Sequence, residues 1–197
     1  MIVAKFGGTS VADAPAIRRL VEIVRSRLAD RPVVVVSALA KVTDALLTLA
    51  ALACAGDEAA LDGAIAALLE RHAATAHALG PAAESAMPPI ADDAAALRRE
   101  LHAALGRPLR PAELDALAGR GEVWSSRLVA GAFAQAGVEA PWVDMRTLML
   151  TDNRFGRATP QMQVFTARAT RDSPPLCRCT EWMACKAGDW KRHSGSV

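Results

Sequence analysis

The chain has 197 residues, of which 52% are hydrophobic and 4% aromatic, and its 23 basic and 21 acidic side chains leave a formal net charge of +2. This length supports one good hydrophobic core, so we expect one domain with an appendage. Because the charges are nearly balanced and spread along the sequence, neither a nucleic acid nor a membrane surface is expected as a partner.

Targeting signals and disulfides are not indicated by the sequence. No stretch approaches the length of a membrane-spanning helix, and the start Met1–Lys5 lacks the basic, apolar and cleavage regions of a signal peptide. We therefore expect a cytoplasmic location. Cys54 is the only cysteine among the first 160 residues, so no disulfide framework is expected there.

A short buried strand is predicted over residues 2–6, and it runs into the turn Lys5-Phe6-Gly7-Gly8-Thr9-Ser10. Glycine reaches backbone angles closed to other residues and lets the main chain approach a ligand without a Cβ. Lys5 adds a cation, and N–H groups at the start of the next helix would also favour negative charge. The turn is a candidate phosphate site, although its spacing matches neither GxxxxGK[ST] nor GxGxxG. The alternative is a tight strand-to-helix turn with an exposed lysine.

Helical spacing of apolar side chains predicts a helix over residues 14–28, with Asp13 as its N-cap and Pro15 in its first turn. The β-branched run Val33–Val36 predicts a second strand, of the kind buried in a parallel sheet. Together these elements form a βαβ unit, in which ligands bind beyond the carboxyl ends of the strands. Polar residues follow both strands, and after the second they lie within Ser37–Thr43.

The rest of the chain divides into a helical stretch, a third strand and a tail. Alanine and leucine dominate residues 43–136, which predicts several helices separated at glycines and prolines. A third strand is predicted over residues 140–144. From residue 161 the chain carries three of the four cysteines and shows no helical or strand periodicity. We therefore expect two parts, residues 1–160 and residues 161–197.

The tail allows two accounts. Cys177, Cys179, Cys185 and His193 are of the types that bind tetrahedral zinc, but the one-residue gap between the first two differs from the usual CxxC loop. We favour the second account, in which a shifted reading frame or a truncated gene produced residues that were never selected to pack. The tail is then disordered or derived from a frameshift, and no metal ligand is assigned.

Four stretches, in the same order along the chain, resemble the aspartate kinases of the amino-acid kinase family. They are Val3–Val11, Val35–Thr43, Gly121-Glu122-Val123-Trp124-Ser125-Ser126, and Trp142–Asp144 with Asp152–Gly156. The resemblance covers residues 1–160 and implies a three-layer α/β/α fold with a mainly parallel sheet, present here in truncated form. The family's glycine-rich Ser-Asp segment, its adenine-binding half and its regulatory ACT domains are not recognisable in the sequence.

The resemblance also implies a reaction and roles for named residues. Aspartate kinases transfer the γ-phosphoryl group of ATP, accompanied by Mg²⁺, to the β-carboxylate of L-aspartate in the biosynthesis of lysine, threonine and methionine. Lys5 would contact the transferring phosphate, and Gly7, Gly8 and Thr9 would hold phosphate oxygens of the nucleotide. Ser37, Thr43 and Glu122 would hold aspartate, since hydroxyls donate to carboxylates and a carboxylate pairs with an ammonium group.

Two of these residues have purely structural alternatives, and two positions depart from the family pattern. Thr43 alternatively caps the following helix, and Glu122 alternatively favours its own helix dipole. Arg120 stands where the family usually has Phe or Tyr, and Lys41 stands where it often has glycine.

Other functions stay open on the sequence alone. Because the adenine-binding half is not recognisable, we expect this chain by itself to be weakly active or inactive. A sister kinase acting on glutamate or a nucleotide monophosphate would share the glycine turn. A non-catalytic module that binds aspartate or a partner is the alternative from another class. Full-length relatives form homo-oligomers, and some belong to fusion enzymes, but the sequence tests neither property here.

Overall fold

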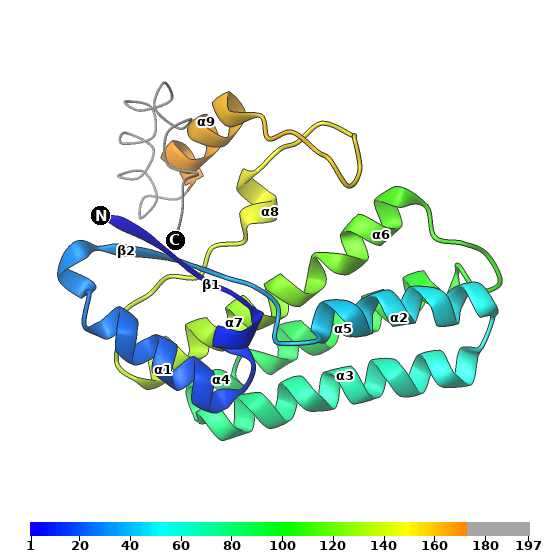
Figure 1. Ribbon diagram of the computed structural model, residues 1–197, viewed down its shortest axis with the longest axis horizontal. Helices are drawn as coiled ribbons and strands as arrows, with labels where there is room; N and C mark the ends of the chain where they lie inside the picture. The colour runs from blue at the N-terminus through cyan, green and yellow to red at the C-terminus, as the bar shows by residue number, and fades with distance from the viewer. Residues whose placement is uncertain (173–197) are drawn as a thin grey trace. The chain divides into compact units, whose positions relative to one another are not determined.

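The computed structural model describes residues 1–172, and the chain divides into two compact units, Met1–Trp142 and the residues from Val143 onward (Figure 1). The first unit holds a small parallel sheet and a set of packed helices, and the described part of the second holds two helices with the loop between them. Residues 173–197 lie outside the described residues, and they include the predicted zinc site and most of the tail that was predicted over residues 161–197 to be disordered or frameshift-derived.

The predicted βαβ unit is confirmed. Strands β1 (Ile2–Phe6) and β2 (Pro32–Val36) pair in parallel, from Ile2 opposite Pro32 to Phe6 opposite Val36. They are joined through the 3-10 turn η1 (Gly8–Val11), helix α1 (Ala14–Arg25) and the 3-10 turn η2 (Leu28–Asp30).

Helix α1 starts where the sequence predicts. The Asp13 carboxylate caps it by accepting a hydrogen bond from the Ala16 N–H at 2.8 Å, and Pro15 lies in its first turn. The helix ends at Arg25, three residues before the predicted end, and the chain continues into η2. The cap and the proline therefore fixed the start of α1 more closely than the apolar spacing fixed its end.

The two faces of the sheet differ in burial. Phe6, Val34 and Val36 pack against the main hydrophobic core. Val3 and Val35 point to the other face, because successive side chains of a strand alternate, and they are 69% and 43% exposed. The core thus anchors the sheet through one face and holds the carboxyl ends of both strands in place.

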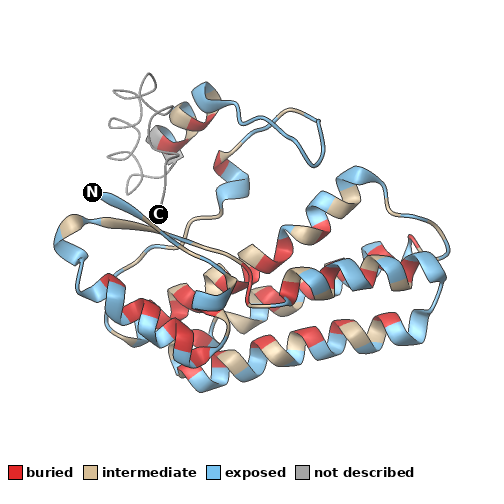
Figure 2. Cartoon of the chain, viewed as in Figure 1, coloured by how far each residue is buried: buried red, intermediate tan, exposed pale blue. Residues whose placement is uncertain are grey.

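Six helices complete the first unit, as predicted for residues 43–136: α2 (Val42–Ala55), α3 (Glu58–Leu79), α4 (Pro81–Glu84), α5 (Met87–His102), α6 (Pro111–Ala118) and α7 (Arg120–Gln135). Helices α2, α3 and α5 run side by side, with their buried residues turned inward (Figure 1 and Figure 2). Helices α4 and α7 pack so closely that a Cβ on Gly131 would lie 2.5 Å from the Ala83 Cα. Glycine at this position is what allows the approach.

The predicted strand over residues 140–144 is wrong, because these residues form no regular element. Pro141 has no N–H to donate to a sheet. The Trp142 indole N–H donates to the Ser126 hydroxyl at 2.9 Å, and the Arg127 guanidinium lies 3.9 Å from the centre of the Trp142 ring. Asp144 then caps α8 (Met145–Leu148), so this stretch is fixed by contacts with α7 and by a helix start.

The second unit contains α8, α9 (Met162–Asp172) and a loop between them. Leu148, Phe165 and Ala169 form its small core. The sequence pattern predicts no helix from residue 161 onward, but α9 forms there. Phe165 and Ala169 are four residues apart, which places them on one helix face. Across the described residues of both units, none of the helices is long and apolar enough to cross a membrane.

Candidate active site

The glycine turn lies directly after β1. Lys5 is exposed, and the turn is closed by a hydrogen bond from the Ser10 N–H to the Gly7 carbonyl oxygen at 2.9 Å. Gly7 has φ −77°, an angle open to any residue, and a Cβ added to it would meet nothing within 4 Å. The prediction that Gly7 is needed for an unusual backbone angle is therefore wrong. What the glycine supplies is an unobstructed main chain that a ligand can approach.

Helix N–H groups contribute less at this turn than the sequence suggests. The turn leads into η1, a single 3-10 turn that contains Thr9, and α1 begins only at Ala14. The Ala16 N–H at the start of α1 is already bound by Asp13. One of the N–H groups that were predicted to be free at the start of this helix is therefore already bound, and Lys5 and the amides of the turn remain to attract an anion.

The loop after β2 lies beside the glycine turn, as the parallel topology predicts. The Ser37 N–H donates to the Phe6 carbonyl oxygen at 3.0 Å, which continues the ladder one step beyond the strands. A Cβ added to Gly8 would lie 3.4 Å from the Ala38 carbonyl oxygen and 3.8 Å from the Ala40 Cα. The carboxyl ends of the two strands thus bring Gly8 and Ser37 into one place.

Helix α7 contacts the loop after β2 through residues of its first two turns. The Glu122 Oε1 accepts a hydrogen bond from the Ala38 N–H at 3.4 Å, and Glu122 is half-buried. The Ser125 hydroxyl donates to the Ser37 carbonyl oxygen at 2.6 Å. The structure therefore brings together three of the residues singled out from the sequence, Gly8, Ser37 and Glu122. Ser125 was quoted only as part of a motif, although its position three residues after Glu122 places it on the same helix face.

Thr43 and Lys41 lie at the start of α2. Thr43 is the second residue of this helix and half-buried, so the alternative in which it caps the helix is wrong. The N-cap is Lys41, whose side chain makes no capping hydrogen bond. Lys41 has φ +66°, a left-handed conformation that glycine adopts without cost. This explains why glycine is common here in the family that the sequence resembles.

Arg120 is a buried arginine that forms ion pairs with two carboxylates which are themselves partly exposed. It is 8% exposed, its Nη2 lies 2.8 Å from the Glu100 Oε1, and its Nε lies 3.3 Å from the Asp93 Oδ2. The Trp124 indole N–H donates to the same Asp93 oxygen at 2.7 Å. Both carboxylates belong to α5, so the network ties the start of α7 to α5. This pairing could not be predicted from sequence pattern, because the partners lie 20 and 27 residues before Arg120.

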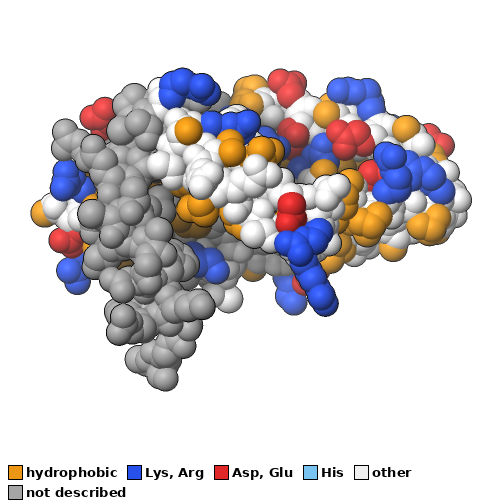
Figure 3. All heavy atoms as spheres, turned by 90° about the horizontal axis from the view of Figure 1, so that it is seen from above, with side chains coloured by type: hydrophobic (Ala, Val, Ile, Leu, Met, Phe, Trp, Pro, Cys, Tyr) orange, Lys and Arg blue, Asp and Glu red, His pale blue; other side chains and the backbone are white. Residues whose placement is uncertain are grey.

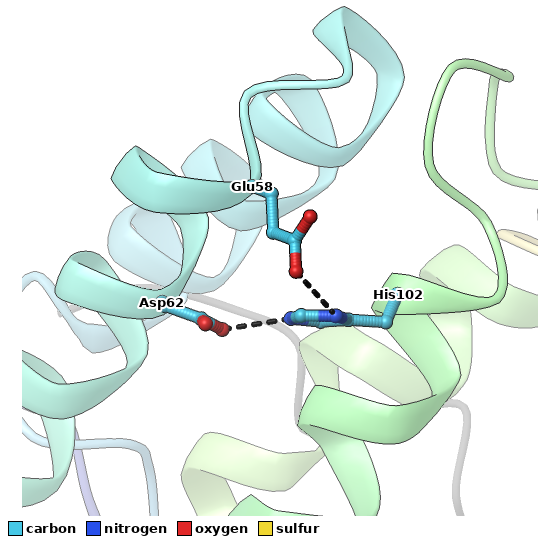
Figure 4. Close-up of side chains that lie close together, drawn as sticks. All are labelled: Glu58, Asp62 and His102. Carbon is cyan, nitrogen blue, oxygen red and sulfur yellow. Dashed lines mark hydrogen bonds and ion pairs between the residues drawn. The ribbon is translucent and has the colours of Figure 1, made fainter.

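A second cluster of polar groups consists of Glu58, Asp62 and His102, and Figure 4 shows the two carboxylates at different nitrogens of the imidazole. The His102 Nδ1 lies 3.5 Å from the Glu58 Oε1, and its Nε2 lies 2.7 Å from the Asp62 Oδ1. The Arg98 Nε donates to the same Asp62 oxygen at 2.7 Å. Hydrogen bonds from Arg98 and then from His102 hold the pKa of Asp62 below its usual value.

This cluster is poorly arranged for a metal. The two nitrogens of an imidazole point in different directions, so one ion cannot bind His102 and reach both carboxylates as they stand. The guanidinium of Arg98 also already compensates the charge of Asp62. We interpret the cluster as an ion-pair network that joins the start of α3 to the end of α5.

The family model described as "Amino acid kinase family" matches residues 1–171. The lysine-sensitive aspartokinase 3 of Escherichia coli is 36% identical over 168 residues, which are 82% of this chain and 35% of that protein. The chloroplastic bifunctional aspartokinase/homoserine dehydrogenase 2 of Arabidopsis thaliana is 33% identical over 153 residues, which are 76% of this chain and 17% of that protein.

The fold is also similar to that of solved structures. The structure of E. coli aspartokinase III in complex with aspartate and ADP matches with a TM-score of 0.71 and 30% identity, over 90% of this chain and 38% of that one. The predicted α/β class with parallel strands, similar to that of the amino-acid kinases, is thereby confirmed. The chain spans between 17% and 38% of the length of these relatives.

Proposed function

Because the chain belongs to the amino acid kinase family, we propose that it carries the phosphate-binding and acceptor-binding part of an aspartate kinase. The reaction would transfer the γ-phosphoryl group of ATP to the β-carboxylate of L-aspartate, giving 4-phospho-L-aspartate. The observation that carries the proposal is the meeting of the glycine turn, the loop after β2 and Glu122 at one edge of the sheet. Phosphoryl donor and acceptor must lie side by side for in-line transfer, and this edge offers groups suited to each.

On the donor side, we assign the phosphate of the nucleotide to the glycine turn. The Lys5 ammonium would neutralise charge on the transferring group, and the amides of Gly7 and Gly8 with the Thr9 hydroxyl would donate to phosphate oxygens. The exposure of Lys5 and the open space beside Gly7 support this assignment. The complex of E. coli aspartokinase III with ADP supports a nucleotide as the donor.

On the acceptor side, we assign aspartate to Ser37, Thr43 and Glu122. The two hydroxyls would donate to a substrate carboxylate, and the Glu122 carboxylate would pair with the ammonium group. One Glu122 oxygen already faces the Ala38 N–H, which fixes the direction of the side chain. Matched relatives are named aspartokinases, and a solved relative holds aspartate, so aspartate is favoured over glutamate or a nucleotide monophosphate.

Mg²⁺ fits this site only as part of the substrate Mg-ATP. Glu122 is the single carboxylate among the residues assigned here, and one of its oxygens is bound to the Ala38 N–H. A protein site for Mg²⁺ usually provides one or two free carboxylates together with the phosphates. We therefore assign no residue of the described part of the chain to the ion and derive no step through it.

The wider biological role follows from the same proposal. Aspartate phosphorylation would place the protein in amino-acid biosynthesis leading to lysine, and we propose a cytoplasmic location. On the face that Figure 3 shows, basic and acidic side chains are interspersed, which agrees with a small-molecule substrate. Since Lys5 is the one cation assigned to a highly charged transition state, we expect the chain alone to turn over weakly or not at all.

Isothermal titration of the chain with L-aspartate, L-glutamate and Mg-ADP tests the proposal. Binding of L-aspartate and Mg-ADP, with at least tenfold weaker binding of L-glutamate, is the expected result. Binding of aspartate without Mg-ADP would instead identify a non-catalytic half-site, and binding of neither would overturn the proposal. A coupled ADP-release assay with aspartate and Mg-ATP measures the turnover that remains.

A further inference from the structure

We infer that Ser125 is a positioning residue, which holds the loop after β2 against α7 in the arrangement that the aspartate site requires. The inference rests on the proposed function for the identity of the ligand. The effect of Ser125 on the loop can be measured without any ligand, as the rate of hydrogen exchange of the loop amides. Ser125 itself lies beneath the proposed site and is assigned no contact with substrate.

The geometry of Ser125 is that of a buried anchor. Ser125 is fully buried, and its Oγ lies 2.6 Å from the Ser37 carbonyl oxygen and 3.1 Å from the Glu122 carbonyl oxygen. A hydroxyl has one proton to donate, so the shorter contact, with Ser37, takes it. The bond crosses 88 residues of sequence and joins α7 directly to the residue that follows β2.

A second hydrogen bond joins the same loop to α7. The Ala38 N–H donates to the Glu122 Oε1 at 3.4 Å, so the loop offers its Ser37 carbonyl to Ser125 and its Ala38 amide to Glu122. The long Ala38–Glu122 bond is the weaker of the two. Ser125 therefore sets the distance between loop and helix, and Glu122 keeps one oxygen directed at the loop while the other is available to a ligand.

Loss of the Ser125 hydroxyl would leave the Ser37 carbonyl without its partner in α7. A partly buried carbonyl that loses its donor moves toward another donor or toward water, and Ser37 moves with it. The two proposed aspartate contacts of Ser37 and Glu122 would then no longer be held at a fixed separation. The glycine turn keeps its own closing bond between Ser10 and Gly7, so the phosphate side would not change.

The experiment compares Ser125→Ala with Ser126→Ala as the matched control. Ser126 is the next residue of α7, and its hydroxyl contacts Val123 and Trp142 instead of the loop after β2. Hydrogen exchange of the Ala38 and Leu39 amides is followed by mass spectrometry on the full chain, together with titrations of L-aspartate and Mg-ADP. Ser125→Cys, which keeps the volume and a weak donor, is measured in parallel in case the alanine variant does not fold.

The expected result is separate behaviour of the two ligands. Ser125→Ala accelerates exchange of the loop amides and weakens aspartate binding by roughly tenfold, the effect of losing one buried hydrogen bond, while Mg-ADP binding stays within twofold. Ser125→Cys shows a smaller effect in the same direction, and Ser126→Ala shows none. Unchanged loop exchange in Ser125→Ala, or in Ser125→Cys if only that variant folds, overturns the inference. So does an equal loss of both ligands.

A failure of the proposed function gives a different pattern. If the unaltered chain binds no aspartate but Ser125→Ala still accelerates loop exchange, the acceptor assignment falls and the hold of Ser125 on the loop stands. If the unaltered chain binds aspartate and Ser125→Ala binds it equally well, the acceptor assignment stands and the inference about Ser125 falls.

Discussion

A Cβ atom on Gly121 would lie 2.7 Å from the Cβ of Ala38, so helix α7 and the loop after β2 meet at a point where no larger residue fits. The same added atom would lie 3.1 Å from the Val42 Cγ1, at the start of α2. Gly121 precedes Glu122 directly. The close approach that glycine allows is therefore what brings the Glu122 side chain to the loop.

Gly121→Ala should destabilise the protein, because the added methyl group meets the Ala38 methyl group and forces the loop away from α7. We expect a loss of about 1–3 kcal/mol in the free energy of unfolding, the usual cost of overpacking. Urea denaturation followed by circular dichroism measures it. Gly63→Ala is the matched control, since an added Cβ there meets nothing within 4 Å in the middle of α3. It should stabilise the protein by about 0.5–1 kcal/mol. Equal stability of the two variants would contradict the close contact.

Long-range contacts of this kind could not be predicted from the sequence. The cap at Asp13, the pairing of two strands and the helical stretch after residue 43 follow from local pattern and turn chemistry. The meeting of Gly121 with Ala38 does not, because it depends on how α7 packs against a loop 83 residues earlier in the chain. The strand predicted over residues 140–144 failed for a related reason, since Trp142 bonds to Ser126 on α7 instead of pairing with a strand.

The candidate site was only partly predictable for the same reason. Topology alone placed Gly8 and Ser37 at one edge of the sheet, and resemblance to a family added Glu122. The anchoring role of Ser125 and the network around Arg120 depend on side chains that become neighbours only when α5, α7 and the loop after β2 pack together.

Arg120→Ala should destabilise the protein through the carboxylates that it leaves behind. Breaking a fully buried ion pair costs about 3–5 kcal/mol, and partial exposure of Asp93 and Glu100 reduces the expected loss to about 2 kcal/mol. Arg110→Ala removes an exposed arginine paired with Glu113 and should cost below about 1 kcal/mol. Urea denaturation of both variants checks the difference. Equal losses in the free energy of unfolding would show that burial of Arg120 does not increase the contribution of its ion pairs to stability.

His72 should make stability depend on pH. It is fully buried, its Nδ1 lies 2.7 Å from the Leu68 carbonyl oxygen, and its ring meets the Trp124 ring edge-on at 5.1 Å. Burial lowers the pKa of His72 below the usual histidine value of 6.5. As pH falls through 6.5, the unfolded chain binds a proton that the folded protein does not accept, so the contribution to stability is full above pH 6.5 and is lost below it.

His72→Met removes the titrating group from this site. When the pH falls from about 7.5 to 5.5, a range that spans the usual pKa of histidine, the free energy of unfolding should decrease less in the variant than in the unaltered protein. Urea denaturation at the two pH values gives the comparison. The same loss in both proteins would mean that another group governs the acid response.

The cluster of Glu58, Asp62 and His102 should not bind zinc tightly. Its carboxylates face different nitrogens of the imidazole, and Arg98 is paired with Asp62. We expect equal melting temperatures in EDTA and in a small excess of Zn²⁺, measured by differential scanning fluorimetry. His102→Ala in the same conditions shows whether any shift comes from this cluster. A rise of several degrees that disappears in His102→Ala would establish a metal site.

The proposed site requires that Mg-ADP and L-aspartate depend on two different side chains, Lys5 and Glu122. Isothermal titration of Lys5→Ala and Glu122→Gln with Mg-ADP and L-aspartate measures this. Lys5→Ala should weaken Mg-ADP binding by about 10- to 100-fold, as expected for a lost charge-assisted hydrogen bond, and leave aspartate binding unchanged. Glu122→Gln should do the reverse. If each variant lost both ligands equally, or neither, the assignment of phosphate to the glycine turn and of aspartate to Glu122 would be contradicted.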